Sequence, residues 1–219
     1  MGGRGGSSHR FGGGFFGRMP LFRNVLSFLD QLQATAYHEL HNFSQTFWQN
    51  LMNDEKIGIR DYTSSWYSPM NKALRDGVQP NAEVAYRIEN ATRVLDRFRA
   101  AENFWAYRGT SLEGTSKLLG GSIAQMSDPS FLKSMIGKEV TDKGFMSTAV
   151  HKDSAWSGVQ YQIYVPKGAH GMYVDPISAN QGEIEFLLQR GTTFKVRRIG
   201  TNSIGTVNSL VLEAKKKKK

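Results

Sequence analysis

The sequence predicts an α+β fold, with helices in the first half of the chain and short strands in the second. Apolar residues recur at helical spacing up to Ala101. After Phe104 the chain changes to short aromatic and β-branched runs, each bounded by Gly, Pro, Asn or Asp. With 219 residues, of which 39% are hydrophobic, it is long enough to bury one substantial core.

Helices are expected over three parts of the first hundred residues. Residues 21–51 carry an apolar stripe that fits one long helix or two short ones. Residues 52–76 read as short helices, interrupted at Gly58 and again before Pro69, because the residue preceding a proline resists the helical region. Residues 81–101 show a further stripe of helical period.

The second half is expected to contain one short helix among several strands. The helix spans Asp128–Met135, with Asp128 as its cap and Pro129 in its first position. The expected strands are Phe104–Arg108, Gly144–Val150, Tyr161–Val165, Gly171–Val174, Glu183–Leu188, Thr193–Ile199 and Ser209–Leu212.

The chain is expected to form one domain with an extension at each end. Residues 1–20 are rich in glycine and predict a flexible arm. Residues 21–214 form the domain, helical over 21–101 and mainly β over 102–214. The lysines of 215–219 supply five units of the +9 net charge. The basic character therefore belongs mainly to this tail, and we do not expect nucleic acid as a partner.

Several classes of protein are excluded by composition. The chain has no cysteine, which rules out disulfides, thiol nucleophiles and cysteine metal sites. His38 and His41 are one helical turn apart but have no further ligand nearby, so no metal is expected. No apolar run is long enough to span a membrane, and the N-terminus lacks the apolar stretch of a signal peptide. We therefore expect action in the cytosol of the cell that makes the protein, or in that of a target cell after delivery by other machinery.

A pair of carboxylates is the first motif suited to chemistry. In a strand, Glu183 and Glu185 would point to the same face, and at least one of them should have a raised pKa if the pair is partly buried. Such a pair can divide the work of a base and an electrostatic stabiliser. A solvent-facing strand edge would show the same spacing, so the pattern alone leaves both readings open.

Two further motifs lie on earlier expected strands. Arg108 ends an apolar strand and is followed by Gly109, so its guanidinium could hold a phosphate or a carboxylate close to the backbone. An arginine that reaches water from a strand end would explain the same residues. In Gly144–Val150, alternation puts Phe145 and Ser147 on one face, where the serine could orient a carboxylate or simply face solvent.

In this order and spacing, the three motifs together resemble the Arg–Ser–Glu class of mono-ADP-ribosyltransferases. That class includes clostridial binary-toxin enzymatic components, insecticidal two-component toxins and phage-encoded transferases. The likeness covers residues 57–213 and includes Trp66–Arg75, Val165–Gly168 and Leu188–Val196. It implies an ADP-ribosyltransferase-like fold, with N-terminal helices followed by a two-sheet mixed or antiparallel β core and a central NAD cleft.

The resemblance also implies a role for each motif, with NAD as substrate and no metal. Ser147 would position Glu185, which would bind the nicotinamide ribose and stabilise the oxocarbenium ion as the glycosidic bond breaks. Arg108 would bind the NAD diphosphate, and the backbone of Gly109 would contact the nicotinamide. The full set of expected NAD-binding residues is Arg108, Gly109, Tyr107, Asn71, Arg75, Phe145 and Thr148.

Glu183 would serve the acceptor. In this family a glutamate two residues before the catalytic acid accompanies arginine targets, whereas glutamine accompanies other acceptors. A guanidinium is a poor nucleophile until a carboxylate orients it and takes its proton. We therefore expect a monomeric enzyme that transfers ADP-ribose to a protein arginine. An NAD glycohydrolase on the same fold and a non-catalytic phage or virion-associated module remain as alternatives.

The chain departs from the family pattern at several places. Ala149 replaces the serine that commonly follows the Ser-Thr pair, and Asn180 stands where an aromatic residue is often found. The loop after Thr148 usually supplies an aromatic and an arginine to NAD, and here it offers Lys152 and Trp156. Recognition of the target protein is expected to differ because of Asn180.

Overall fold

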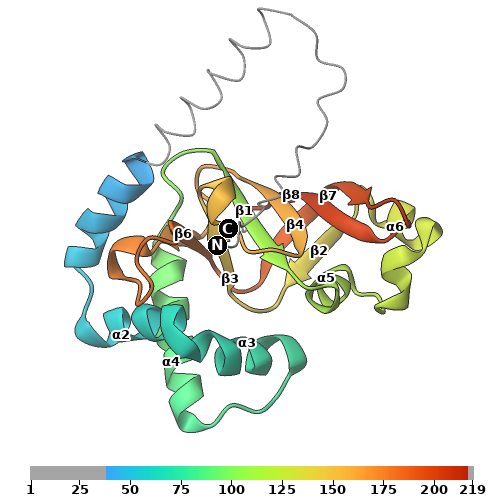
Figure 1. The fold of residues 1–219 in the computed structure, drawn as a ribbon. Coiled ribbons are helices and arrows are strands. Elements are labelled where there is room, and N and C mark those ends of the chain that lie inside the picture. The colour runs from blue at the N-terminus through green and yellow to red at the C-terminus, as the bar shows by residue number, and fades with distance from the viewer. Residues whose placement is uncertain (1–37, 217–219) are drawn as a thin grey trace, which may run out of the picture.

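The structure is a computed structural model that describes residues 38–216 of the chain. The expected arm of residues 1–20, the first part of the 21–51 helical segment and the last three lysines lie outside the described residues. Residues 38–49 are helical. Figure 1 shows α2, α3 and α4 gathered on one side of a sheet, with α5 and α6 near its far end.

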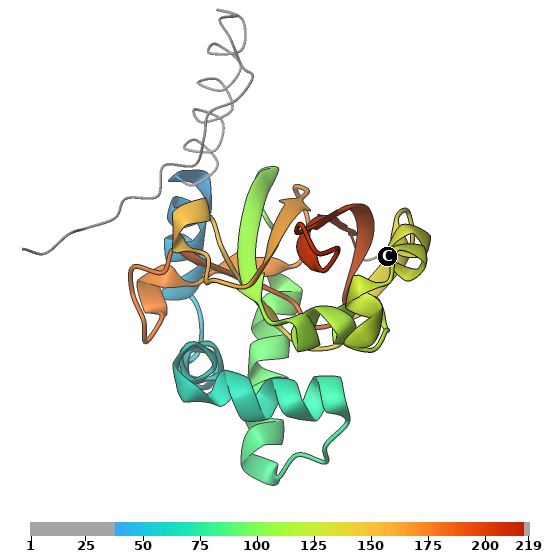
Figure 2. The same ribbon diagram turned by 45° about the vertical axis from the view of Figure 1, so that its right-hand side comes forward.

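Four helical elements make up the layer beneath the sheet: α2 (Asn53–Asp61), the π-helical η1 (Tyr62–Trp66), α3 (Tyr67–Asp76) and α4 (Ala82–Arg97). α4 begins as expected, because the Asn81 side chain accepts a hydrogen bond from the Val84 amide. Figure 2 shows α3 and α4 crossing below the strands.

The expected breaks at Gly58 and before Pro69 are wrong. α2 continues through Gly58, where a Cβ would lie 2.8 Å from Asn90 Cβ, so the glycine allows α2 and α4 to approach closely. Pro69 is the third residue of α3, where its missing N–H would have no helical partner. The break occurs instead at Ser64, whose backbone (φ −94°, ψ −108°) is not helical.

Shorter helices connect the strands: α5 (Leu112–Leu119), η2 (Ala124–Ser127), α6 (Pro129–Met135), η3 (Lys152–Ser154) and η4 (Asp175–Ile177). α6 confirms the expected short helix, and the Asp128 side chain caps it by accepting from the Ser130 amide. α5 was not expected from the sequence. Among the described residues, no helix is both long and apolar enough to cross a membrane.

Eight strands form the sheet: β1 (Phe104–Thr110), β2 (Glu139–Asp142), β3 (Met146–Ala149), β4 (Val159–Val165), β5 (Gly171–Tyr173), β6 (Glu185–Leu188), β7 (Thr192–Thr201) and β8 (Val207–Ala214). Their order is β2-β7-β8-β4-β1-β3-β6-β5, and only β4 and β8 pair in parallel. β2 was not expected. The two sheets expected from the resemblance are joined into one at β1–β3, where only Tyr107 and Ala149 are paired.

The two faces of β6 pack into different cores. Phe186 and Leu188 lie in the larger core among the strands, whereas Leu187 lies in a second core with the helices α2–α4. Because side chains alternate along a strand, Glu185 shares the face of Leu187 and points toward the helical layer. The fold therefore presents a carboxylate to the space between sheet and helices.

Candidate active site

The pairing of β3 with β6 brings Ser147 and Glu185 together. Ser147 is opposite Leu187 and Ala149 is opposite Glu185, so the serine and the glutamate are diagonal neighbours on one face. Phe145 shares the face of Ser147 and packs in the helix-facing core, as the alternation predicted. The Ser147 side chain makes a hydrogen bond that lowers the pKa of Glu185.

Burial has the larger effect on that carboxyl group. Glu185 is 4% exposed. The pKa of Glu185 is raised to about 7, mainly because the carboxyl group is removed from water; the nearby charge of Glu183 also raises it, while the Ser147 hydrogen bond and Arg108 oppose the shift. A carboxyl group with this pKa is partly ionised near neutral pH and is poised to titrate there.

Arg108 comes from β1, the strand next to β3. Its Nη1 donates a 2.7 Å hydrogen bond to the backbone carbonyl of Ser147, which fixes the guanidinium beside the serine and glutamate. This contact uses one of its N–H groups, and a guanidinium has five. The others are available to an anionic group in the adjoining cavity.

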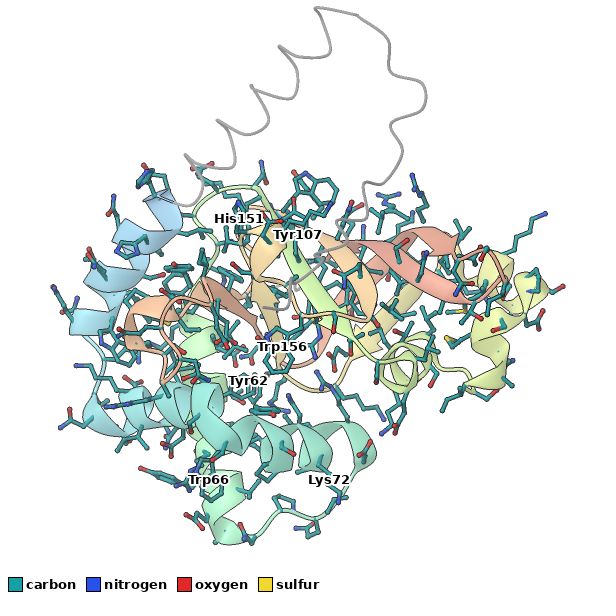
Figure 3. The ribbon with its side chains drawn as sticks, in the orientation of Figure 1. Tyr62, Trp66, Lys72, Tyr107, His151 and Trp156 are labelled. Carbon is teal, nitrogen blue, oxygen red and sulfur yellow. The ribbon has the colours of Figure 1, made fainter. Side chains whose placement is uncertain are left out.

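A cavity of about 860 Å³ lies between the sheet and the helices, and Arg108, Ser147, Glu183 and Glu185 all line it. This volume is within the range of small-molecule sites. Figure 3 shows Tyr62 and Trp156, two further lining residues, between the strands and the α2–α3 layer. Tyr107, Gly109, Asn71, Arg75 and Thr148 also line it, so nine of the ten expected site residues converge on one cavity.

Phe145 is the expected site residue that does not line the cavity. Its side chain is fully buried against Tyr62, with ring centroids 5.5 Å apart. Its backbone is the functional part, because its amide donates to Asn71 Oδ1 and its carbonyl accepts from Arg75. Thr148 lines the cavity, but its hydroxyl donates to the Phe186 carbonyl at 2.6 Å and serves the β3–β6 pairing.

Glu183 does not stand on a strand, contrary to the sequence prediction. β6 begins at Glu185, and Ile184 adopts φ 52°, a left-handed backbone that is rare for a β-branched residue. The Asp175 carboxylate stabilises this turn by accepting from the Gly182 and Ile184 amides, each at 2.9 Å. Glu183 is therefore presented by a turn, half-buried at the cavity, next to the buried Glu185.

Arg75 and Asn71 connect α3 to the loop that leads into β3. Arg75 makes a bidentate ion pair with the buried Asp142, through Nε to Oδ1 at 2.8 Å and Nη2 to Oδ2 at 2.7 Å. Burial lowers the pKa of Arg75, but the hydrogen bond and charge of Asp142 outweigh it and raise the pKa. Both side chains pack on Gly144, where a Cβ would lie 2.6 Å from Asn71 Oδ1.

The loop at residues 151–158 covers the end of β1. A Cβ on Gly109 would lie 1.7 Å from the carbonyl oxygen of Trp156, so the protein's own loop occupies the space that we expected a ligand to use. Trp156 lines the cavity with 70% of its surface exposed, whereas Lys152 is not among the lining residues. This distinguishes the two loop residues that the sequence left unassigned.

Sequence reasoning missed Tyr62 and Asp142. Tyr62 is buried, accepts a hydrogen bond from Asn71 Nδ2 and donates to the Phe145 carbonyl. Burial, followed by the charge of Glu185, raises its pKa to about 12, so it stays protonated beside the site. Neither residue lies in a recognisable motif, because Tyr62 and Phe145 are 83 positions apart in the chain, and Arg75 and Asp142 are 67 apart. The described residues contain no group of three or more His, Cys, Asp or Glu side chains that could hold a metal.

Comparison with known proteins gives the family. Residues 40–219 match the ADP-ribosyltransferase exoenzyme family, and the chain belongs to it. The NAD(+)–arginine ADP-ribosyltransferase EFV of Enterococcus faecalis is 27% identical over 169 residues, which are 76% of this chain and 33% of that protein. The mono-ADP-ribosyltransferase C3 of a Clostridium botulinum D phage is 26% identical over 194 residues, covering 78% of this chain and 76% of that enzyme.

Solved structures show the same fold. Plx2a, an ADP-ribosyltransferase toxin from Paenibacillus larvae, superposes with a TM-score of 0.67 at 24% identity, over 84% of this chain and 96% of that one. C3stau2 from S. aureus, solved with NAD, gives 0.65 at 17% identity, over 82% and 95%. The predicted α+β fold and the family are confirmed. The chain spans a third of the Enterococcus protein and about three quarters of the phage enzyme.

Proposed function

We propose that this protein transfers ADP-ribose from NAD to a protein arginine and releases nicotinamide. The observation that carries the proposal is the convergence of Arg108, Ser147, Glu183 and Glu185 on one cavity, in a member of the ADP-ribosyltransferase exoenzyme family. C3stau2, with the same fold, has been solved with NAD, and EFV is named as an arginine transferase.

Bond cleavage is assigned to Glu185. Its carboxylate accepts a hydrogen bond from the nicotinamide ribose and provides a fixed negative charge where the oxocarbenium ion develops. The bond between ribose C1′ and the nicotinamide nitrogen breaks, and nicotinamide leaves with the electron pair. Arg108 holds the diphosphate with the N–H groups that Ser147 does not use.

Acceptor activation is assigned to Glu183. A guanidinium nitrogen attacks C1′, and Glu183 takes the proton that this nitrogen loses. The half-buried position of Glu183 at the cavity supports this role, because an acceptor has to arrive from outside.

Since one chain supplies all the site residues, the reaction needs no second subunit. We place it in the cytosol of a target cell, where NAD and protein arginines occur together.

A glycohydrolase is the second candidate, since water can replace the guanidinium at C1′ with the same Arg108 and Glu185. The glutamate at position 183 favours transfer, because hydrolysis alone does not need a second carboxylate. A non-catalytic module is disfavoured, because a carboxylate is kept buried at a cost in solvation.

The test is incubation of the purified protein with labelled NAD and agmatine, a small guanidino compound, and separately with a protein acceptor. The proposal expects labelled ADP-ribosyl-agmatine, labelled protein and released nicotinamide, all abolished by Glu185→Gln. Nicotinamide release with no labelled acceptor would identify a glycohydrolase instead. If NAD is not consumed by either the unaltered protein or the variant, the protein is not an enzyme of this class.

A further inference from the structure

The turn that leads to Glu183 is hydrogen-bonded to the helical layer at Thr63. The Thr63 hydroxyl accepts a 2.9 Å hydrogen bond from the Ala179 amide, and the Thr63 carbonyl accepts one of the same length from the Asn180 side chain. Thr63 is 6% exposed, so both acceptor atoms belong to a buried residue. Its hydroxyl proton is also used, in a bond to the Arg60 carbonyl.

The helical layer has an irregular backbone at the point where this turn contacts it. Thr63 lies in η1, and the backbone leaves helical geometry at Ser64, directly after the carbonyl that Asn180 contacts. π-helical segments of this kind are frequent at functional sites. Thr63, Ser64, Asn180 and Glu183 all line the same cavity. The kink therefore belongs to the site and is not a remote irregularity.

The polar side chains of the turn are occupied by hydrogen bonds within the protein. Asn180 contacts Thr63, the Ser178 hydroxyl accepts from the Asn180 amide, and Gln181 Nε2 donates to the Pro176 carbonyl. Gly182 has φ 98° and no side chain. The turn consequently offers the acceptor one charged group, the carboxylate of Glu183.

Glu185 is held by different contacts. It is part of β6, pairs with Ala149, and its carbonyl accepts from the Val174 amide. None of these contacts passes through Thr63. A disturbance at Thr63 should therefore displace Glu183 while leaving Glu185 in place.

We propose that Thr63 is a positioning residue for acceptor activation, which acts by seating the Ala179–Asn180 turn so that Glu183 faces an incoming guanidinium. This inference rests on the proposed transfer reaction and deepens it. According to this inference, Thr63 controls how much of the ADP-ribose is transferred to an acceptor and how much is lost to hydrolysis. The inference also implies that the charge of Glu183 is the main feature by which an accessible guanidinium is recognised. Small guanidino compounds should then serve as acceptors as well as proteins.

The experiment compares Thr63→Val with Thr63→Ser. Valine has nearly the same shape but lacks the hydroxyl that receives Ala179, whereas serine keeps it. We expect Thr63→Val to lower ADP-ribosyl-agmatine formation by about tenfold, since a small misplacement of a reacting group has effects of this size. Nicotinamide release without acceptor should change by no more than about twofold, and Thr63→Ser should transfer like the unaltered protein. Asn180→Ala, an exposed change on the turn, should show the same selective loss in a smaller degree.

The outcomes separate the possible failures. Equal loss of transfer and hydrolysis in Thr63→Val, with a lowered unfolding temperature, would show a merely structural role and overturn the inference. Unchanged transfer in both Thr63→Val and Asn180→Ala would overturn it too. If the unaltered protein itself makes no ADP-ribosyl-agmatine while releasing nicotinamide, the transfer reaction is refuted and this inference with it.

Discussion

Two glutamates only two positions apart stand in different surroundings. Glu185 is buried in a strand, and Glu183 is half-buried in a turn with a left-handed residue between them. The left-handed backbone at Ile184 replaces the alternation of a strand and aims the two carboxylates independently. A strained backbone persists only where the surrounding contacts hold it in place. At Ile184 these contacts are the two hydrogen bonds that the Gly182 and Ile184 amides donate to Asp175. Separate environments suit the separate roles that we propose.

The pKa of Glu185 predicts how hydrolysis depends on pH. Only the ionised carboxylate stabilises the oxocarbenium ion, and its pKa is about 7 in the free protein. The kcat/KM for NAD hydrolysis should therefore rise about tenfold per pH unit below that value and level off above it. Steady-state rates from pH 5 to 9 measure this. A profile that is flat across this range would contradict the assignment.

Ser147 should set the position of that profile. Its hydrogen bond lowers the pKa of Glu185, so its loss should raise that pKa and move the rising limb to higher pH. We expect Ser147→Ala to be most impaired below pH 7 and to recover part of its activity at high pH. A uniform loss at every pH would indicate that Ser147 does not act through the ionisation of Glu185.

Among the elements, the most constrained contact is that of the 151–158 loop with β1. Gly109 is required there because the Trp156 backbone occupies the place of a side chain. We expect Gly109→Ala to displace the loop and raise the KM for NAD by about tenfold or more. Gly120→Ala is the control for backbone strain alone, since its φ of 70° disfavours alanine while a Cβ there meets nothing within 4 Å. Initial-rate kinetics on both variants check this, and an equal KM in the two would contradict the proposed role of the loop.

The periodic spacing of apolar residues and the positions of Gly, Pro, Asn and Asp were enough to predict most helices and strands. The apolar stripe of α4, the Asp128 cap of α6 and seven strand cores are recognisable because each depends on local residues. Gly58 was misread because its role is a contact with α4, which no local pattern contains. β2 was missed for a related reason, since it is a four-residue edge strand that pairs only with β7.

In the candidate site, too, the residues in local motifs could be predicted and those that depend on distant contacts could not. Arg108, Ser147 and the two glutamates form ordered motifs, so the sequence predicted that they act together. The ion pair of Arg75 with Asp142 and the hydrogen bond of Tyr62 to Phe145 connect residues far apart in the chain. The turn geometry of Glu183 depends on Asp175 and Thr63, which lie outside every motif. Such residues become visible only when the fold is known.

For the molecule as a whole, the buried carboxylate should reduce stability above acidic pH. The folded-state pKa of Glu185 is raised from 4.5 to about 7, so the folded state binds the proton more tightly than the unfolded state. Its contribution is then neutral below pH 4.5 and becomes increasingly unfavourable as pH rises to 7, reaching roughly 3 kcal/mol at most.

Glu185→Gln should therefore stabilise the protein at pH 8 and have little effect at pH 4.5. For a chain of this size the expected gain is on the order of 5–10 °C in unfolding temperature at pH 8. Thermal unfolding of both proteins at the two pH values measures the difference. A variant that is less stable than the parent at pH 8 would contradict the account of Glu185 as a strained, functional carboxylate.

The central claim is that Glu185 breaks the NAD bond and Glu183 activates the acceptor. The most direct measurement is the ratio of ADP-ribosyl-agmatine formation to NAD hydrolysis for Glu183→Gln, with both rates taken on the same preparation. We predict that transfer falls by about a hundredfold or more, while hydrolysis without acceptor stays within about threefold of the parent. Equal loss of both rates, or full retention of transfer, would contradict this division of labour.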